Sequence, residues 1–559
     1  MTATGDGAGP QTGKDEAPPA PPSADGRAER EAATSTLKNT VSSNVAVTVG
    51  SKLLYMATRL VTPPIILAYV TLPEYGLWAT CFILISYVGM GAFGVSNVYI
   101  RYSAEFAARG ETGRINRLVS TGLTVLTGFG LVVLGAVWLG LPSILRAFKV
   151  PAELHTVARL LFVGTVAAFV LDLTLGAVAY VLTGLQRIAL VNGVWVVAFL
   201  LETALTLAFL FGGLGIASLL WAFVARSVFS VVAHWVLLRR ALPGFAIRIP
   251  SFDRESLRLF AGYGTVVQLS GLFGMVLRSI EKVIAGTFIG VETTALFDLG
   301  EKFPMMGTQI PGSITGVLLP ASYHLEGQNR RAEILKLYVK GGRYMNVVCG
   351  IMMGYMTAFA APLITGWMGP DPKFVPAILI LAVFPIAWQM NLLTGPCSAI
   401  FRSFGKPSQE LVYPLVQAIL VAVSVAAGFA AYGRTVPVVA VAVSASMVAS
   451  ALVYLAYANR QGGLSQEEWS RKVLLPGLTP YLVAGAIFLA ATPALGAAHS
   501  GRGWAVALVL VTGTVHTAIS GFLFYRFHCD WGEREFLRKQ AAHTLGSLLA
   551  KAGLWKGAA

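Results

Sequence analysis

Long apolar runs separated by short polar connections are the main pattern along this chain. Fourteen runs are long enough to cross a bilayer as helices, each of which needs about 20 mainly apolar residues. Open β-structure is excluded in lipid, because every unpaired backbone group there costs several kcal/mol. We therefore predict an all-α polytopic membrane protein, with spans at 41–70, 74–100, 118–140, 157–183, 189–211, 213–238, 258–286, 293–319, 341–366, 374–401, 409–431, 436–458, 473–495 and 503–526.

The composition supports membrane insertion and sets one region apart. The 559 residues are 55% hydrophobic and 12% charged, whereas soluble domains carry about 25% charged residues. Residues 1–40 are instead rich in Pro, Gly, Ala and charge, and they lack the apolar centre of a signal peptide. This composition is typical of a disordered segment, here a cytoplasmic tail.

The basic residues indicate the topology. Of the 42 Lys and Arg, 29 lie in the two tails and the even-numbered connections, and five lie in the alternate connections. Such a bias marks the cytoplasmic side of membrane proteins, so both termini are expected in the cytoplasm. The net charge of +15 is then explained by topology, and no nucleic-acid partner is expected.

A weak internal repeat suggests the domain organisation. The stretch Arg59–Trp78 resembles Arg278–Phe297, at an offset of 219 residues. Two bundles of six helices follow, and parallel repeats of this kind place substrate at their interface. The predicted parts are a tail at 1–40, bundles at 41–240 and 241–460, two additional spans within 461–530, and a tail at 531–559.

Several charged residues fall inside the spans, where they are expensive unless they face the bundle interior or a water-filled cavity. The repeat places Arg59 and Arg278 at equivalent positions in the first helix of each half. Their guanidinium groups are suited to bidentate recognition of phosphate. We expect both to face one shared cavity.

The acidic residues within the spans are candidates for coupling or gating. Asp172 and Glu202 stand alone in their spans, where a buried carboxyl can carry a proton or pair with a neighbouring helix. A second set is expected to pair as a network across two neighbouring helices, either for gating or simply to hold them together. Its members are Glu281, Lys282, Asp298, Glu301 and Lys302.

Other chemistry is not indicated. The four cysteines and seven histidines have no spacing typical of a disulfide framework or a metal site. There is no GxxxxGK[ST] motif for ATP hydrolysis. We therefore expect a protein that is not an enzyme and that uses no metal or cofactor, with energy taken from an ion gradient, the membrane potential or the substrate gradient.

Three motifs carry a resemblance to a known family. They are PEYGLW at Pro73–Trp78, RYSAEFAARGETGRINRLVST at Arg101–Thr121, and SIEKVIAGTFIGVETTALFDLGEKF at Ser279–Phe303. Over about 41–460 the chain resembles polysaccharide flippases of the O-antigen and teichoic-acid type, within the multidrug/oligosaccharidyl-lipid/polysaccharide (MOP) exporter superfamily. Glu281-Lys282 replaces an acidic–basic pair that often begins with Asp there, which weakens a claim of ion coupling at Glu281.

The resemblance implies a MATE-like fold, with twelve core spans, two more helices and a central cavity. It implies flipping of a polyprenyl-pyrophosphate-linked oligosaccharide across the bacterial cytoplasmic membrane, by alternating access. Arg59, Arg278 and Lys52 would then bind the diphosphate, and Gln268 would contact sugar. Partners would be the lipid-linked substrate, membrane lipids, and a polysaccharide polymerase or glycosyltransferases.

Three alternatives stay open at this point. A cation-coupled multidrug antiporter belongs to the same superfamily. A membrane glycosyltransferase or polymerase would need catalytic acids and a sizeable outer loop, whereas the outer loops here are short. A flippase for a lipid-linked peptidoglycan precursor also fits fourteen spans.

Overall fold

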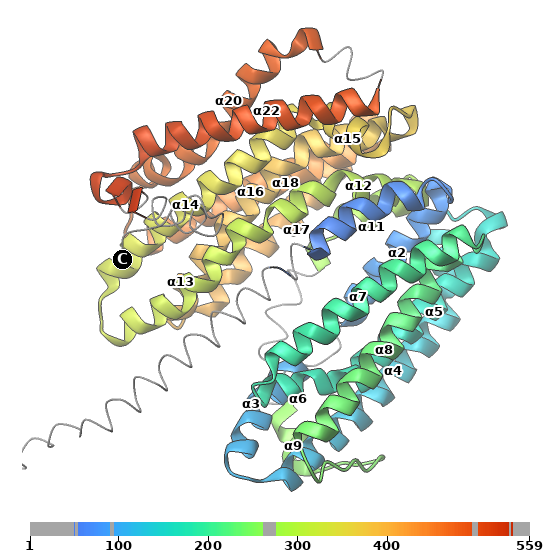
Figure 1. The fold of residues 1–559 in the computed structure, drawn as a ribbon. Coiled ribbons are helices and arrows are strands. Elements are labelled where there is room, and N and C mark those ends of the chain that lie inside the picture. The colour runs from blue at the N-terminus through green and yellow to red at the C-terminus, as the bar shows by residue number, and fades with distance from the viewer. Residues whose placement is uncertain are drawn as a thin grey trace, which may run out of the picture. The chain divides into compact units, whose positions relative to one another are not determined.

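The computed structural model describes residues 54–89, 94–260, 276–494 and 501–535, together with Gly50 and residues 538–539. All regular elements in these ranges are helices, which confirms the predicted all-α fold (Figure 1). From Tyr55 onward the chain forms one compact unit. The tail at 1–40 lies outside the described residues, as do two predicted site residues, Lys52 and Gln268.

The first half contains a helix over residues 54–66, followed by eight labelled helices and short helical turns. The α-helices are α2 (Leu72–Gly89), α3 (Val95–Ala108), α4 (Thr112–Ala147), α5 (His155–Thr174), α6 (Val178–Gly184), α7 (Ile188–Phe211), α8 (Ala217–Ala241) and, in the connection to the second half, α9 (Arg254–Leu259).

The second half and the two additional spans follow the same pattern. Their helices are α11 (Ile280–Phe288), α12 (Val291–Gly307), α13 (Gln309–Gly327), α14 (Arg331–Ala358), α15 (Ala360–Met368), α16 (Val375–Ser403), α17 (Val412–Tyr432), α18 (Val436–Gln461), α19 (Gln466–Trp469), α20 (Leu475–Ala490) and α22 (Arg502–Leu523).

Nine helices in the described ranges are long and apolar enough to cross a membrane. They correspond to the predicted third to sixth and tenth to fourteenth spans. A tenth span forms if α14 and α15, which meet at a bend of 76°, are taken together. Pro362 lies in the first turn of α15, where a helix tolerates the missing N–H, and this favours a new helix start after Phe359.

The other four predicted spans are the first two of each half, so the total of fourteen stays a prediction. Here the described helices are shorter, as in α12 and α13, which are separated at Thr308. Gly94, in the left-handed conformation with φ of 64°, precedes α3, and Pro304 interrupts the hydrogen-bond ladder within α12.

The helix positions repeat with the offset found in the sequence. The starts of α2 and α12, of α4 and α14, and of α8 and α18 each differ by 219 residues. These three pairs of helices therefore begin at equivalent positions in the two halves. A duplicated arrangement of six spans accounts for this agreement.

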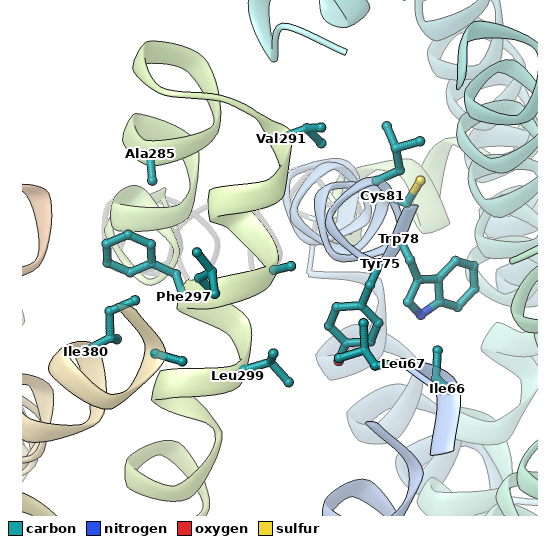
Figure 2. Packing of buried hydrophobic residues seen from close by; sticks show 14 of the residues in the cluster. Ile66, Leu67, Tyr75, Trp78, Cys81, Ala285, Val291, Phe297, Leu299 and Ile380 are labelled. Atoms are coloured by element: carbon teal, nitrogen blue, oxygen red, sulfur yellow. The ribbon is translucent and has the colours of Figure 1, made fainter. Parts of the chain in front are cut away.

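The halves meet where α2 packs against α12 (Figure 2). Tyr75 of α2 and Val291 and Leu299 of α12 belong to one buried apolar cluster. A Cβ added at Gly76 would overlap the carbonyl oxygen of Val291, so glycine permits this close approach. Trp367 of α15 adds a second link, because its indole N–H donates to the Leu60 carbonyl at 2.5 Å.

The two additional spans are packed closely onto the second half, with α20 against α14 and α22 against α15 (Figure 1). The amide of Gln389 donates to Asn346 Oδ1 at 2.6 Å and accepts from the Tyr481 hydroxyl at 2.8 Å. Because Gln389 is fully buried in this network, it joins α14, α16 and α20.

Candidate functional site

Four charged side chains in the first half form a continuous ladder of ion pairs. Glu202 lies between two arginines, with Oε1 3.3 Å from Arg59 and Oε2 3.2 Å from Arg226 Nε. Arg226 also contacts Asp172 at 2.7 Å. Asp172 and Glu202, each alone within its span, therefore pair with arginines of neighbouring helices, which is one of the two alternatives that the sequence left open, and the ladder balances two positive charges with two negative ones.

Four helices supply this ladder. Arg59 lies on the helix over 54–66, Asp172 on α5, Glu202 on α7 and Arg226 on α8. The helix α8 packs against both α5 and α7, which brings the three side chains together (Figure 1). The Ser227 hydroxyl donates to Asp172 at 3.0 Å and fixes the far end of the ladder.

Aromatic rings surround the arginines. The Arg59 guanidinium lies 5.2 Å from the centre of the Tyr55 ring, and Arg226 lies 4.6 Å from that of Phe223. Trp195 and Phe199 of α7 pack against Tyr55, at centroid distances of 5.3 and 5.6 Å. Such rings stabilise a cation that has left water.

The ladder is partly accessible, which matters for binding. The Arg59 side chain is 36% exposed, while that of Glu202 is 10% exposed. Arg226 and Asp172 are intermediate, at 20% and 22%. A ligand approaching the ladder therefore meets Arg59 first.

The charged residues of the second half form a separate cluster, as the spacing of residues on α11 and α12 predicts. Asp298 accepts from Lys282 at 3.2 Å and from Lys302 at 2.7 Å. It also accepts from the Tyr75 hydroxyl of α2, at 3.0 Å. Through Tyr75 the first half contributes a hydrogen bond to the charged cluster of the second half.

Two further acids complete this cluster. Glu281 and Glu301 are each 2% exposed, and their carboxyl groups interact directly. The Oε1 atom of each has no hydrogen-bond partner among the described residues. Two ionised carboxylates at such a buried site would repel each other.

Arg278 is placed differently from Arg59. It lies in the turn before α11 and is exposed. Within the described ranges it has no ion pair, whereas Arg59 is paired with Glu202. The expectation that both arginines face one cavity stays a prediction, because no contact in the described residues brings them together.

Sequence reasoning missed two residues of these clusters. Arg226 was not among the candidates chosen from the sequence, although an arginine in an apolar helix is already a signal of function. Tyr75 lies in the PEYGLW motif, yet its partner Asp298 is 223 residues away. Within the described part of the chain, no group of three or more His, Cys, Asp or Glu is arranged to hold a metal ion.

Comparison with known proteins places the chain in a family. Residues 41–326 match the family described as polysaccharide biosynthesis protein. This match covers more than half of the 559 residues. The chain belongs to the polysaccharide biosynthesis protein family. A comparison with curated proteins gave no match.

Solved structures show the same fold at low sequence identity. The lipid II flippase MurJ, in an inward closed conformation, has a TM-score of 0.64 and 12% identity, with 86% of this chain and 98% of that chain covered. An inward-facing MATE family multidrug resistance transporter has a TM-score of 0.59 and 15% identity, with 74% and 94% covered.

A MOP superfamily transporter from Pyrococcus furiosus is a third similar structure. Its TM-score is 0.51 at 16% identity, with 75% of this chain and 93% of that chain covered. These likenesses establish that the family member described here has the fold of the MOP superfamily.

Proposed function

We propose that this protein flips a polyprenyl-diphosphate-linked oligosaccharide from the inner to the outer leaflet of the bacterial cytoplasmic membrane. The product would serve polysaccharide synthesis at the cell surface. The observation that carries this proposal is the partly exposed Arg59, which lies beside Arg226 in the first-half ladder. A diphosphate crossing the membrane needs such permanently charged, planar donors.

The headgroup site is assigned mainly to arginine. Arg59 and Arg278 bind the diphosphate, Lys52 supports them, and Gln268 contacts the sugar. The 36% exposure of the Arg59 side chain and the exposure of Arg278 support this assignment. Alternating access would then carry the bound headgroup between the two sides of the membrane.

Coupling is assigned to the acids. The buried pair of Glu281 and Glu301 is suited to gain and lose one proton, and its neighbours Lys282 and Asp298 respond to that charge. The Tyr75 hydroxyl links this cluster to α2 of the other half, where relative motion of the halves would break the contact. Asp172 and Glu202 regulate the arginines with which they pair.

The charge distribution supports a topology, and the proposed substrate indicates the partners. The excess of Lys and Arg in the tails and even-numbered connections supports cytoplasmic termini. A polysaccharide polymerase or glycosyltransferases would meet the substrate on either side of the membrane.

Among the alternatives, a lipid-linked cargo is favoured over a drug, because the similarity to the lipid II flippase covers 86% of this chain and that to the MATE transporter 74%.

Single substitutions in the host cell test the proposed function. Arg59→Ala and Arg278→Ala are each expected to abolish surface polysaccharide while the protein remains inserted, because a neutral side chain cannot hold the diphosphate. The measurements are surface polysaccharide, the lipid-linked intermediate that accumulates, and protein level in the membrane.

Arg240→Ala is the matched control, because Arg240 is exposed at the end of α8. It should leave export unchanged. Normal surface polysaccharide in both test variants would reject the headgroup site. Accumulation of a peptidoglycan precursor in the deletion strain would instead assign the protein to that cargo.

A further inference from the structure

One carboxylate in the first half occupies the position that an anionic ligand would take. Each oxygen of Glu202 faces a different guanidinium, with Oε1 3.3 Å from Arg59 and Oε2 3.2 Å from Arg226. Two oxygens of a phosphate group could bridge the same two cations. The Glu202 residue is 7% exposed, so its charge is held mainly by these arginines.

The arginines of the ladder do not use all of their hydrogen-bond donors within it. The buried Arg226 Nε forms no aligned hydrogen bond among the described residues, although Glu202 lies within ion-pair distance. Arg59 retains a third of its side chain exposed. Both arginines therefore keep donor capacity beyond what Glu202 uses, and a larger anion could use it.

The contacts around Glu202 make it the group whose charge or position must change when an anion binds. From the helix over 54–66 it faces Arg59, and from α8 it faces Arg226. Asp172 of α5 reaches it only through Arg226, and Asp172 is already held by the Ser227 hydroxyl. Tyr55 contributes its ring through Arg59. Glu202 is thus the one member of this set that bridges both cations.

An incoming diphosphate would bring negative charge against a carboxylate in a site that is poorly hydrated. Like charges there repel far more strongly than in water. Glu202 must therefore lose its charge or leave the arginines when the headgroup binds. A proton taken from the cytoplasmic side achieves the first at the least structural cost, because the helices need not move.

We propose that Glu202 is a built-in counter-ion, which holds Arg59 and Arg226 in the empty transporter and takes up a proton when a diphosphate headgroup displaces it. This proposal rests on the proposed function and deepens it. The headgroup and one proton bind together on the inner side. After release on the outer side, Glu202 loses the proton and closes the ladder again.

Direct binding measurements test this proposal. The probe is farnesyl diphosphate, and the protein is the full chain in lipid nanodiscs. Wild-type protein should bind the probe with uptake of one proton beyond that from the probe itself, so affinity should rise up to about tenfold per unit fall in pH. Glu202→Gln should bind about tenfold more tightly than wild type at pH 8, and it should lack the extra proton uptake.

Two further variants separate charge from position. Glu202→Asp keeps the charge on a shorter side chain, and it should keep the extra proton uptake. Glu410→Gln breaks the Arg402–Glu410 pair at the connection between α16 and α17, which has a contact of 2.7 Å, and it should behave as wild type. Because the probe titrates in the same range, the difference between Glu202→Gln and wild type is the quantity to compare.

The outcomes separate the proposal from the function on which it rests. Binding without extra proton uptake by wild type, or weaker binding by Glu202→Gln, would overturn the counter-ion role and leave the flippase function intact. Failure of both proteins to bind the probe at every pH would overturn the diphosphate site as well. If Glu202→Gln does not fold, Glu202→Ala, which also lacks the carboxylate, gives the same difference in proton uptake.

Discussion

The two halves of this molecule both hold a charged cluster, but the clusters differ in their chemistry. The first half uses two arginines, which stay protonated, and balances them with two acids. The second half uses two lysines and three acids, of which Glu281 and Glu301 are almost fully buried. The two halves of a duplicated fold therefore hold clusters of different chemistry, to which the proposed function assigns anion binding in the first half and a change of charge in the second.

Burial differs in the same direction, chiefly at Arg59 and at the two glutamates. The Arg59 side chain is 36% exposed, whereas Glu281 and Glu301 are each 2% exposed. The other charged side chains of both clusters lie between 10% and 22%. A partly exposed arginine can exchange a protein carboxylate for a ligand. A cluster with two buried carboxyl groups instead makes the net charge decisive, because unpaired charge there is costly.

The largest expected effect comes from Asp298→Asn, which leaves Lys282 and Lys302 without their shared carboxylate. Removing one partner of a buried ion pair costs about 3–5 kcal/mol. The free energy of unfolding in mixed detergent micelles should fall by this amount. Asp371→Asn, which breaks an exposed pair with Lys373, is the control and should cost at most about 1 kcal/mol. A loss no greater than in the control would show that the ion pairs of the second-half cluster do not behave as buried ones.

A smaller effect is expected from Asp172→Asn in the first half. Arg226 keeps Glu202 as a partner, so the loss should be about 1.5–3 kcal/mol. The same unfolding measurement gives a direct comparison with Asp298→Asn. If Asp172→Asn proved the more destabilising of the two, the contrast between the two clusters would be wrong.

The smallest effect concerns an ion pair outside the spans, at the C-terminal end of the described chain. Burial alone would raise the pKa of Glu533, but the Asp530 N–H, Lys340 and Arg343 together hold it below its ordinary value. A lowered pKa in the folded state means that this contact stabilises at neutral pH. The contribution is lost as pH falls below the ordinary glutamate value of about 4.3.

Protease protection of the segment after α22 measures this loss. Protection should decrease in wild type as the solution is acidified through that range. Glu533→Gln should show little protection at any pH and no transition. A transition that persists in Glu533→Gln would mean that groups other than Glu533 hold this segment in place. The titration of this one carboxylate outside the spans would then not predict how the clusters within the spans behave.

Helix packing explains why the two clusters were not equally predictable. Lys282, Asp298 and Lys302 lie on consecutive short helices, and Lys302 is four residues from Asp298, so their pairing follows from local spacing. Arg59 and Glu202 are 143 residues apart, and nothing in their local patterns links them. Arg226 was visible as a charge within an apolar helix, but its pairing with Asp172 and Glu202 was not.

The sequence by itself determined the all-helical membrane fold, the family, and the 219-residue repeat, because apolar runs of about 20 residues and the distribution of Lys and Arg govern how a chain enters a bilayer. It also placed charge inside the spans. Only the tertiary structure decided which charges neutralise one another and that Tyr75 reaches Asp298 across the two halves. Those contacts depend on the rotation and approach of packed helices, which the hydrophobic pattern of a single span does not specify.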